Sequence, residues 1–368
     1  HSGTLNFTGI MVPGSVVEGG GATLDCEVSG AACVDALQTR WLHWRDLFIR
    51  AKGAAVPTIG LQIGVIGSGV ADTNVFDNVT VSGNFSLAAV YNRGSETTLW
   101  NHLLAWNSYS GGTAYDLVLD GYNHFGVTSA FQTVSLPADT AISFQENTFI
   151  APDLRRTGPG AAVWSGSTMR HRYIGGYVGN TGASGVTNYG FVLYGSNTLL
   201  DLDIHFEAYP YLTDAIYVSA PSGTTSETLN GLRIRDNLFE GANSVFKVDG
   251  GLSGGVTLTN ADIEIGDMMY ATKVFDSTTP WVAVAGSYKL PAASTAWNLP
   301  AAQFSGIGMV GASPSFSGNG AALTNVPFVL PSTLSLSNIV NTGGVSSITM
   351  ATHGNYEFVS GAALANFP

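Results

Sequence analysis

The chain has 368 residues, of which only 11% are charged, and its formal net charge is −12. The negative charge and the absence of any Lys/Arg cluster disfavour nucleic acid as a partner, and no apolar run is long enough to cross a membrane. The low charge and the 46 glycines are typical of a β-rich extracellular protein rather than a cytosolic enzyme.

The N-terminal residues already fit a repeating pattern of short apolar stretches, beginning at Leu5 with LNFTGIMVPG. Because the chain starts inside this pattern, we expect a further segment before His1 that caps the open end of the fold. Cys26 and Cys33 stand in a Gly/Ala-rich loop and either form a small disulfide or remain two thiols. There is no Cys/His pattern of a zinc site, so we expect no metal and no cofactor.

Residues 36–52 admit two interpretations. An amphipathic helix would place Leu37, Trp41, Trp44 and Phe48 on one stripe. The stretch HWRDLFIRA also matches the strand-like FDNVTVSG further along the chain. We predict a strand because of that match.

The clearest copy of the repeat is LRIRDNLFEGANSVFKVDGG, Leu232–Gly251, which reads as two short strands with a bend between them. Equivalent positions in successive copies are Leu61, Ala89, Leu117, Val163, Val192, Ile216, Phe246 and Val274. These positions lie about 28 residues apart, except for a step of 46 between Leu117 and Val163. Such units must stack to share a core. The sequence therefore predicts an all-β fold: a right-handed single-stranded parallel β-helix of about eight or nine rungs over residues 1–277.

The long step places an insertion of about 18 residues between Tyr122 and Pro137, given the period of such repeats. Long loops on a regular scaffold are disproportionately functional. The aromatic residues that crowd this region are our candidates for sugar contact: Trp106, Tyr109, Tyr122 and His124. For Trp106 and Tyr109, filling the interior of a rung is an equal alternative.

Charged residues align in two outward columns with alternating sign. The first column holds Arg170, Asp201, Arg233 and Asp262, and the second holds Arg172, Asp203, Arg235 and Glu264. Such columns form either a ladder of ion pairs, each contributing about 0.2–1 kcal/mol, or a polar groove for a glycan.

Candidate catalytic groups lie in the same region. Glu207 and Glu240 end similar strands on neighbouring rungs, with Asp203 and Asp236 as diagonal partners. Because glycosidases use two carboxyl groups about 5–10 Å apart, these four residues are candidates for hydrolysis. A lyase instead needs a base and cations beside a uronate carboxylate. Its candidates, which include further substrate-binding residues, are His205, Tyr173, Arg170, Arg172 and Arg235.

The period fails after Ser277. We expect a Pro/Gly/Ser-rich connection over 278–327 and a smaller C-terminal β module over 328–368. The segment FSGNGAALTNVP, Phe316–Pro327, is similar to a short segment near the C-termini of phage fibre proteins. Together with the Gly/Asn/Ser-rich repeat of low charge, it makes the chain resemble bacteriophage tailspike or tail-fibre proteins with a pectate-lyase-like parallel β-helix.

The resemblance implies a homotrimer in the virion tail, held together by the C-terminal module, that binds or depolymerises a bacterial surface polysaccharide as a hydrolase or a lyase. It also implies that a part preceding His1 attaches to other tail proteins. Two alternatives remain open: a non-enzymatic fibre or receptor-binding protein, and a free pectate-lyase-like enzyme.

Overall fold

The computed structural model describes residues 1–10, 12–64, 71–127, 138–139, 146–166, 169–180, 187–195, 197–198, 200–207, 213–240, 243–269, 273–276, 281–289, 297–298, 303–310 and 316–317. The chain divides into two units, His1–Val326 and Pro327–Pro368. The expected C-terminal module, 328–368, lies outside the described residues.

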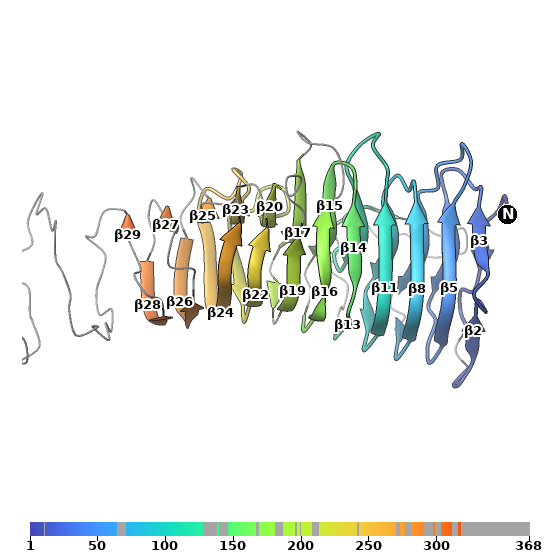
Figure 1. Ribbon diagram of the computed structural model, residues 1–368, viewed down its shortest axis with the longest axis horizontal. Helices are drawn as coiled ribbons and strands as arrows, with labels where there is room; N and C mark the ends of the chain where they lie inside the picture. Colours follow the sequence, from blue (N-terminus) through green and yellow to red (C-terminus); the bar gives the residue numbers. More distant parts are fainter. Residues whose placement is uncertain are drawn as a thin grey trace, which may run out of the picture. The chain divides into compact units, whose positions relative to one another are not determined.

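The first unit is all-β: parallel strands stack as a β-solenoid of about eight turns, as the repeat predicted. Each turn contributes to two long parallel sheets, and shorter strands continue the sheets at both ends. Figure 1 shows β5, β8, β11, β14 and β16 side by side in chain order. Successive equivalent strands are therefore neighbours in space, so residues about one period apart come into contact.

The 12-stranded sheet consists, in spatial order, of β1 (Leu5–Asn6), β4 (Ala32–Leu37), β6 (Ile59–Gly64), β9 (Ala88–Arg93), β12 (Ala114–Asp120), β15 (Gly160–Gly166), β17 (Asn188–Tyr194), β20 (Asp214–Ser219), β23 (Ser244–Val248), β25 (Lys273–Asp276), β27 (Trp297–Asn298) and β29 (Phe316–Ser317).

The 15-stranded sheet contains β2 (Val16–Glu18), β3 (Thr23–Cys26), β5 (His43–Ala51), β8 (Val75–Gly83), β11 (Leu99–Asn107), β13 (Thr148–Ile150), β14 (Asp153–Arg156), β16 (Arg172–Asn180), β18 (Asn197–Thr198), β19 (Asp201–Glu207), β21 (Ser226–Asn230), β22 (Arg233–Glu240), β24 (Gly255–Met269), β26 (Trp281–Lys289) and β28 (Gln303–Val310). A separate pair is formed by β7 (Ala71–Asp72) and β10 (Ser95–Glu96).

The two choices that the N-terminal sequence left open are resolved. Residues 36–52 contain the end of β4 and the whole of β5, so the strand prediction is confirmed. Cys26 and Cys33 form a disulfide that joins β3 to β4, with Cα atoms 5.8 Å apart. The repetition begins at Leu5, because β1 pairs in parallel with β4.

The two sheets also continue past Ser277. In the region expected to be a connection, β26 pairs with β24, β28 pairs with β26, and β27 and β29 extend the 12-stranded sheet. Strand stacking therefore reaches into the range 278–327.

The interior between the sheets is filled by apolar side chains, including a run of stacked aromatic rings. The rings of Trp44, Phe76, Trp100, Phe149 and Tyr173 follow one another over five strands. Neighbouring centroids are between 3.9 and 5.8 Å apart. Trp100 fills the interior, as expected, and is fully buried.

The predicted register is wrong by one residue at three places in the 12-stranded sheet. Leu61 pairs with Val90 rather than Ala89, Val163 with Phe191 rather than Val192, and Phe246 with Phe275 rather than Val274. The cause is that several of these strands are buried on both faces. Alternation of apolar and polar residues then no longer marks the inward side.

Candidate functional site

The structure divides the predicted site residues between the two sheets. On the 15-stranded sheet, β16, β19 and β22 carry Arg172, Asp203, His205, Glu207, Arg235, Asp236 and Glu240, and β11 carries Trp106. Tyr122 and His124 instead follow β12 of the 12-stranded sheet. Trp106 therefore lies on a different sheet from the strand that Tyr122 and His124 follow.

The best-defined polar geometry on the 15-stranded sheet is the pair His205–Asp236. His205 Nδ1 lies 3.2 Å from Asp236 Oδ1 on the neighbouring rung. The same carboxylate accepts hydrogen bonds from the backbone N–H groups of Phe206 (3.0 Å) and Leu238 (3.2 Å). Asp236 is thus fixed by three donors, and it fixes the imidazole in turn.

The burial of the two partners differs sharply. The Asp236 side chain is only 4% exposed, whereas that of His205 is 37% exposed. Burial raises the pKa of Asp236 above its usual range, while the Phe206 N–H, His205 and the Leu238 N–H act in the opposite direction. When Asp236 is ionised, Nδ1 donates to it and Nε2 keeps its lone pair. This is the arrangement of a general base held in position.

A bulge in β22 creates this pair. Asp203 is opposite Arg235 and Glu207 is opposite Glu240, so β22 contains one residue more than β19 between these two points. An extra residue re-aims side chains in a strand. In a strict register Asp236 would be opposite Ile204. The extra residue instead lets the buried Asp236 carboxylate contact His205.

Tyr177 and Arg155 lie beside His205 on the next rungs. Tyr177 is opposite His205 in the strand register, and Asp153 is opposite Tyr177. The Arg155 guanidinium carbon lies 5.2 Å from the Tyr177 ring centroid. Arg155 also makes two hydrogen bonds to Asp153, at 2.6 and 2.8 Å. A phenol, an imidazole and a guanidinium therefore share one outward surface, which we call the His205 surface.

Tyr173, the tyrosine proposed for lyase chemistry, has a different place. It is fully buried, and its ring stacks on Phe149 at 4.6 Å, so it belongs to the interior. Burial also raises the pKa of its phenol well above the usual range. Tyr177 was not among the residues predicted from the sequence, because the register shifts between Ile174 and Tyr177, at Gly175 and Gly176, which both have positive φ. The Gly-Gly pair was the signal for that shift.

The charged columns exist, but both begin differently from the prediction: Arg172 takes the place of Arg170 in the first column, and Ile174 takes the place of Arg172 in the second, opposite Asp203. The observed order is Arg172, Asp201, Arg233 and Asp262 on four successive strands. Arg170 has a positive φ and pairs with Glu146 instead. The reason for the change is that β16 begins only at Arg172, after the buried His171.

The ion pairs of this ladder are long and exposed. Arg172–Asp201 is 3.7 Å, Arg233–Asp201 and Arg233–Asp262 are 3.5 Å, and Arg235–Asp262 is 3.7 Å. The arginine side chains are 40–56% exposed, and each such pair contributes about 0.2–1 kcal/mol. Their guanidinium groups remain accessible to an anionic ligand.

The carboxylates proposed for hydrolysis are only partly placed. Glu207 and Glu240 are register partners on adjacent strands, which lie about 4.8 Å apart in a sheet. Glu240 is half-buried and Asp203 is exposed. The direction of the Glu207 side chain lies outside the description, so the catalytic pair remains a prediction.

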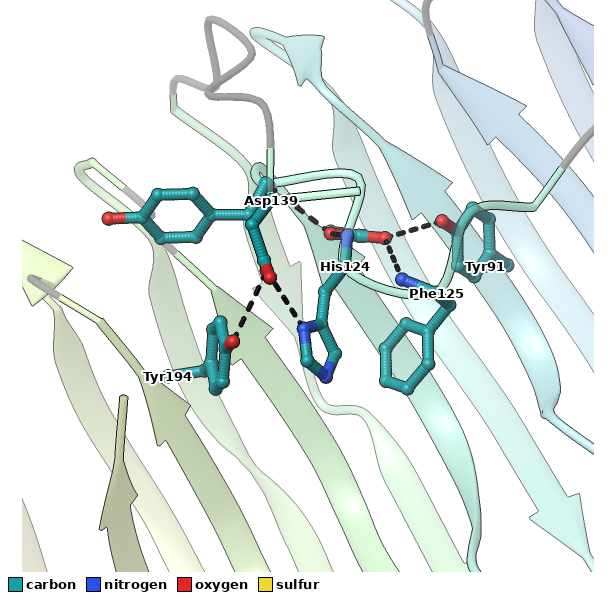
Figure 2. Close-up of polar contacts among 7 residues, drawn as sticks. Tyr91, His124, Phe125, Asp139 and Tyr194 are labelled. Atoms are coloured by element: carbon teal, nitrogen blue, oxygen red, sulfur yellow. Dashed lines mark hydrogen bonds and ion pairs between the residues drawn. The ribbon is translucent and has the colours of Figure 1, made fainter. Parts of the chain in front are cut away.

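A second histidine–aspartate pair lies in the insertion that follows β12 (Figure 2). His124 Nδ1 is 3.0 Å from Asp139 Oδ1, and the Tyr194 hydroxyl donates to the same oxygen at 3.2 Å. The His124 ring stacks on Trp164 at 5.3 Å and also contacts Phe125 and Tyr194. The contacts of His124 with Asp139, Trp164 and Tyr194 were not expected from the sequence, because these residues follow the insertion in the chain.

Asp120, the last residue of β12, fixes the start of the insertion. Its carboxylate accepts from the backbone N–H groups of Tyr122, His124 and Phe125 and from the Tyr91 hydroxyl at 2.6 Å. The Phe125 ring in turn packs on Tyr115 and Trp164. Residues 121–127 are thus built onto the outer aromatic surface of the 12-stranded sheet.

Trp106 and Tyr109 take no part in this cluster. Trp106 is 43% exposed on β11. The Tyr109 carbonyl accepts a hydrogen bond from the buried Arg156, which also binds the carbonyls of Asn107, Ala114 and Pro159. Arg156 therefore serves to hold this bend of the chain.

Comparison with protein-family models, curated proteins and solved structures found no match for this chain. Among the described residues, no group of three or more His, Cys, Asp or Glu side chains is arranged to hold a metal ion. The same part of the chain contains no helix of the length and apolarity needed to cross a membrane.

Proposed function

We propose that this protein is a tailspike-type protein that binds a bacterial surface polysaccharide and depolymerises it on the His205 surface. The observation that carries the proposal is the His205–Asp236 pair, with an accessible imidazole held by a nearly buried carboxylate. Tyr177 and Arg155 flank it, and the arginines of the ladder lie on the same sheet.

The geometry fits β-elimination at a uronate residue. Nε2 of His205 removes the proton on the carbon next to the uronate carboxylate, and that C–H electron pair forms the new C=C bond. The bond from the neighbouring carbon to the glycosidic oxygen breaks, and this oxygen leaves with the bonding electrons and takes a proton from the Tyr177 hydroxyl. An arginine neutralises the carboxylate, which makes the adjacent proton more acidic.

Hydrolysis is the second candidate. The register pairing of Glu207 with Glu240 favours it, because carboxyl groups on neighbouring strands approach the spacing of a retaining pair, about 5–5.5 Å. The product distinguishes the two reactions: elimination yields an unsaturated uronate that absorbs in the ultraviolet, whereas hydrolysis yields only new reducing ends.

The test is to incubate the purified chain with a panel of bacterial capsular polysaccharides, half of them containing uronates, and to measure both products. We expect unsaturated products from at least one uronate polymer and their loss in His205→Asn. Binding without any release of product would overturn the enzymatic part and favour a non-enzymatic fibre or receptor-binding protein. Products that persist at the wild-type rate in His205→Asn would remove the reaction from this histidine.

The same proposal includes a homotrimeric assembly in the virion tail, with attachment to other tail proteins through a part preceding His1. A trimer in light scattering is the expected result for the full chain. A monomer would overturn the tailspike assignment and favour a free lyase.

A further inference from the structure

The outer face of the 12-stranded sheet changes character along the stack. Over β9, β12 and β15 its outward side chains, such as Tyr91, Val118 and Trp164, are buried, and Phe125 of the insertion packs on this part. Over β17 and β20 the outward side chains of Tyr189 and Tyr217 are only half-buried. The aromatic surface thus continues beyond the part that the insertion covers.

The rings of Tyr189 and Tyr217 are stacked face to face, so that each covers one face of the other. Their centroids are 4.4 Å apart and their planes differ by 8°. The rings come from neighbouring rungs but not from register partners, because Tyr189 is opposite Asp214 and Tyr217 is opposite Val192. A rigid, half-exposed aromatic plane offers an apolar surface at little entropic cost.

Polar groups surround this plane. The Tyr217 hydroxyl donates to Asp249 Oδ2, and the other Asp249 oxygen accepts from the Gly251 N–H at 2.7 Å. Lys247 is opposite Tyr217 on the neighbouring strand, and its Nζ lies 3.8 Å from the buried Asp214. The Asp214 carboxylate also accepts from the Ser244 hydroxyl at 2.6 Å.

The two phenols remain protonated over the physiological range. Burial, helped by Asp214 and Asp249, raises the pKa of Tyr189 to about 12. Burial and the hydrogen bond to Asp249 also raise the pKa of Tyr217. Both hydroxyls therefore act as neutral donors and acceptors beside a carboxylate and an ammonium group.

We infer that Tyr189, Tyr217, Lys247 and Asp249 form a saccharide-binding site on the 12-stranded sheet, separate from the His205 surface. The C–H face of a pyranose ring packs on an outer face of the tyrosine stack, while its hydroxyl groups bond to Asp249 and Lys247. An apolar surface with a few fixed polar groups is the general make-up of a small-molecule site. The inference rests on the proposed function only in taking a polysaccharide as the ligand, and it requires no cleavage.

The experiment uses the full chain carrying His205→Asn, so that the polymer is not degraded, and immobilised polysaccharides of the same panel as probes. We expect Tyr189→Ala and Tyr217→Ala to weaken binding about tenfold each, the loss typical of a central aromatic contact. Tyr217→Phe keeps the plane and should lose less. Trp41→Ala, at an exposed aromatic between β4 and β5, is the matched control and should bind unchanged.

The outcomes separate this site from the proposed function. Unchanged affinity in both Tyr→Ala variants, with wild-type circular dichroism, would overturn the site while leaving polysaccharide binding intact. A changed subunit number in light scattering would assign the face to contact between copies and would also overturn it. Should either Tyr→Ala variant unfold, Lys247→Gln replaces it in the binding assay, because a side chain that is 38% exposed can be changed without unfolding the chain. Unchanged affinity in Lys247→Gln would then overturn the site. A wild-type chain that binds no polysaccharide of the panel would overturn both proposals.

Discussion

The described residues include two histidine–aspartate pairs whose imidazoles are similarly exposed, 37% for His205 and 33% for His124, yet whose aspartates differ in burial. Asp236 is almost buried in the 15-stranded sheet and accepts two backbone N–H groups. Asp139 is 42% exposed and accepts from a tyrosine hydroxyl. Backbone N–H groups therefore hold the aspartate of the first pair, whereas a side-chain hydroxyl holds that of the second.

The difference shows what each pair can do. The buried carboxylate of Asp236 cannot move without losing its backbone donors, so His205 is held in one orientation, as the proposed elimination requires. His124 is held mainly by ring contacts with Trp164, Phe125 and Tyr194, and its contact with Asp139 closes the insertion onto the sheet. We therefore assign the proposed elimination to His205 and Asp236, and the anchoring of the insertion to His124 and Asp139.

The largest expected effect comes from replacing the two aspartates. Asp236→Asn should lower the rate of depolymerisation about a hundredfold or more, because a positioning partner of a catalytic histidine is lost. Asp139→Asn should leave the rate unchanged. Initial rates of product release measure both, and Asp236→Glu should restore part of the activity. Equal effects of the two Asn variants would contradict the proposal that only the His205–Asp236 pair takes part in the reaction.

The aromatic support of His124 predicts a large loss of stability. Trp164→Ala should lower the free energy of unfolding by about 3–5 kcal/mol, since a nearly buried indole is removed from between three other rings. Trp106→Ala, at a 43% exposed position, should change it by less than about 0.5 kcal/mol. Thermal or urea unfolding provides the measurement, and a small effect of Trp164→Ala would contradict the role of this cluster.

A third histidine, His171, sharpens the comparison because it is fully buried. Burial lowers its pKa from 6.5 to about 3 in the folded chain. The unfolded chain therefore binds a proton below pH 6.5 that the folded chain does not bind until about pH 3. Stability should fall as the pH falls through this window, by up to about 1.4 kcal/mol per pH unit.

Unfolding midpoints measured between pH 7 and pH 4 test this prediction. His171→Gln removes the titrating group, so its unfolding free energy should depend less on pH than that of the wild type. His102→Gln, at an exposed position of β11, is the matched control. Parallel pH profiles for the wild type and His171→Gln would rule out a neutral buried imidazole.

The smallest effect is expected at the charged ladder. Arg233→Gln should cost about 1 kcal/mol or less, because its ion pairs are long and exposed. The difference from the wild type should shrink as salt is raised, since exposed charges are screened. A larger or salt-independent loss would show that the ladder supports the fold more strongly than its geometry indicates.

The parallel β-solenoid could be predicted from the sequence because each copy of the repeat has the same pattern of strands. The sequence was insufficient where a single residue changes the register. His205 and Asp236 were both singled out, but their pairing depends on the bulge in β22. Tyr177 replaces Tyr173 beside the histidine because of the shift at Gly175 and Gly176. Where both faces of a strand are buried, as in β6 and β9, no polar residue marks the register.

The rings stacked in the interior also make the protein a reporter of its own unfolding. Trp44 and Trp100 enclose Phe76 in that stack and are fully buried, whereas Trp164 lies in the outer aromatic cluster. Indole emission from the first two residues follows the interior of the N-terminal rungs, and emission from Trp164 follows the layer beneath the insertion. Single-tryptophan variants would therefore show whether the insertion detaches before the rungs separate.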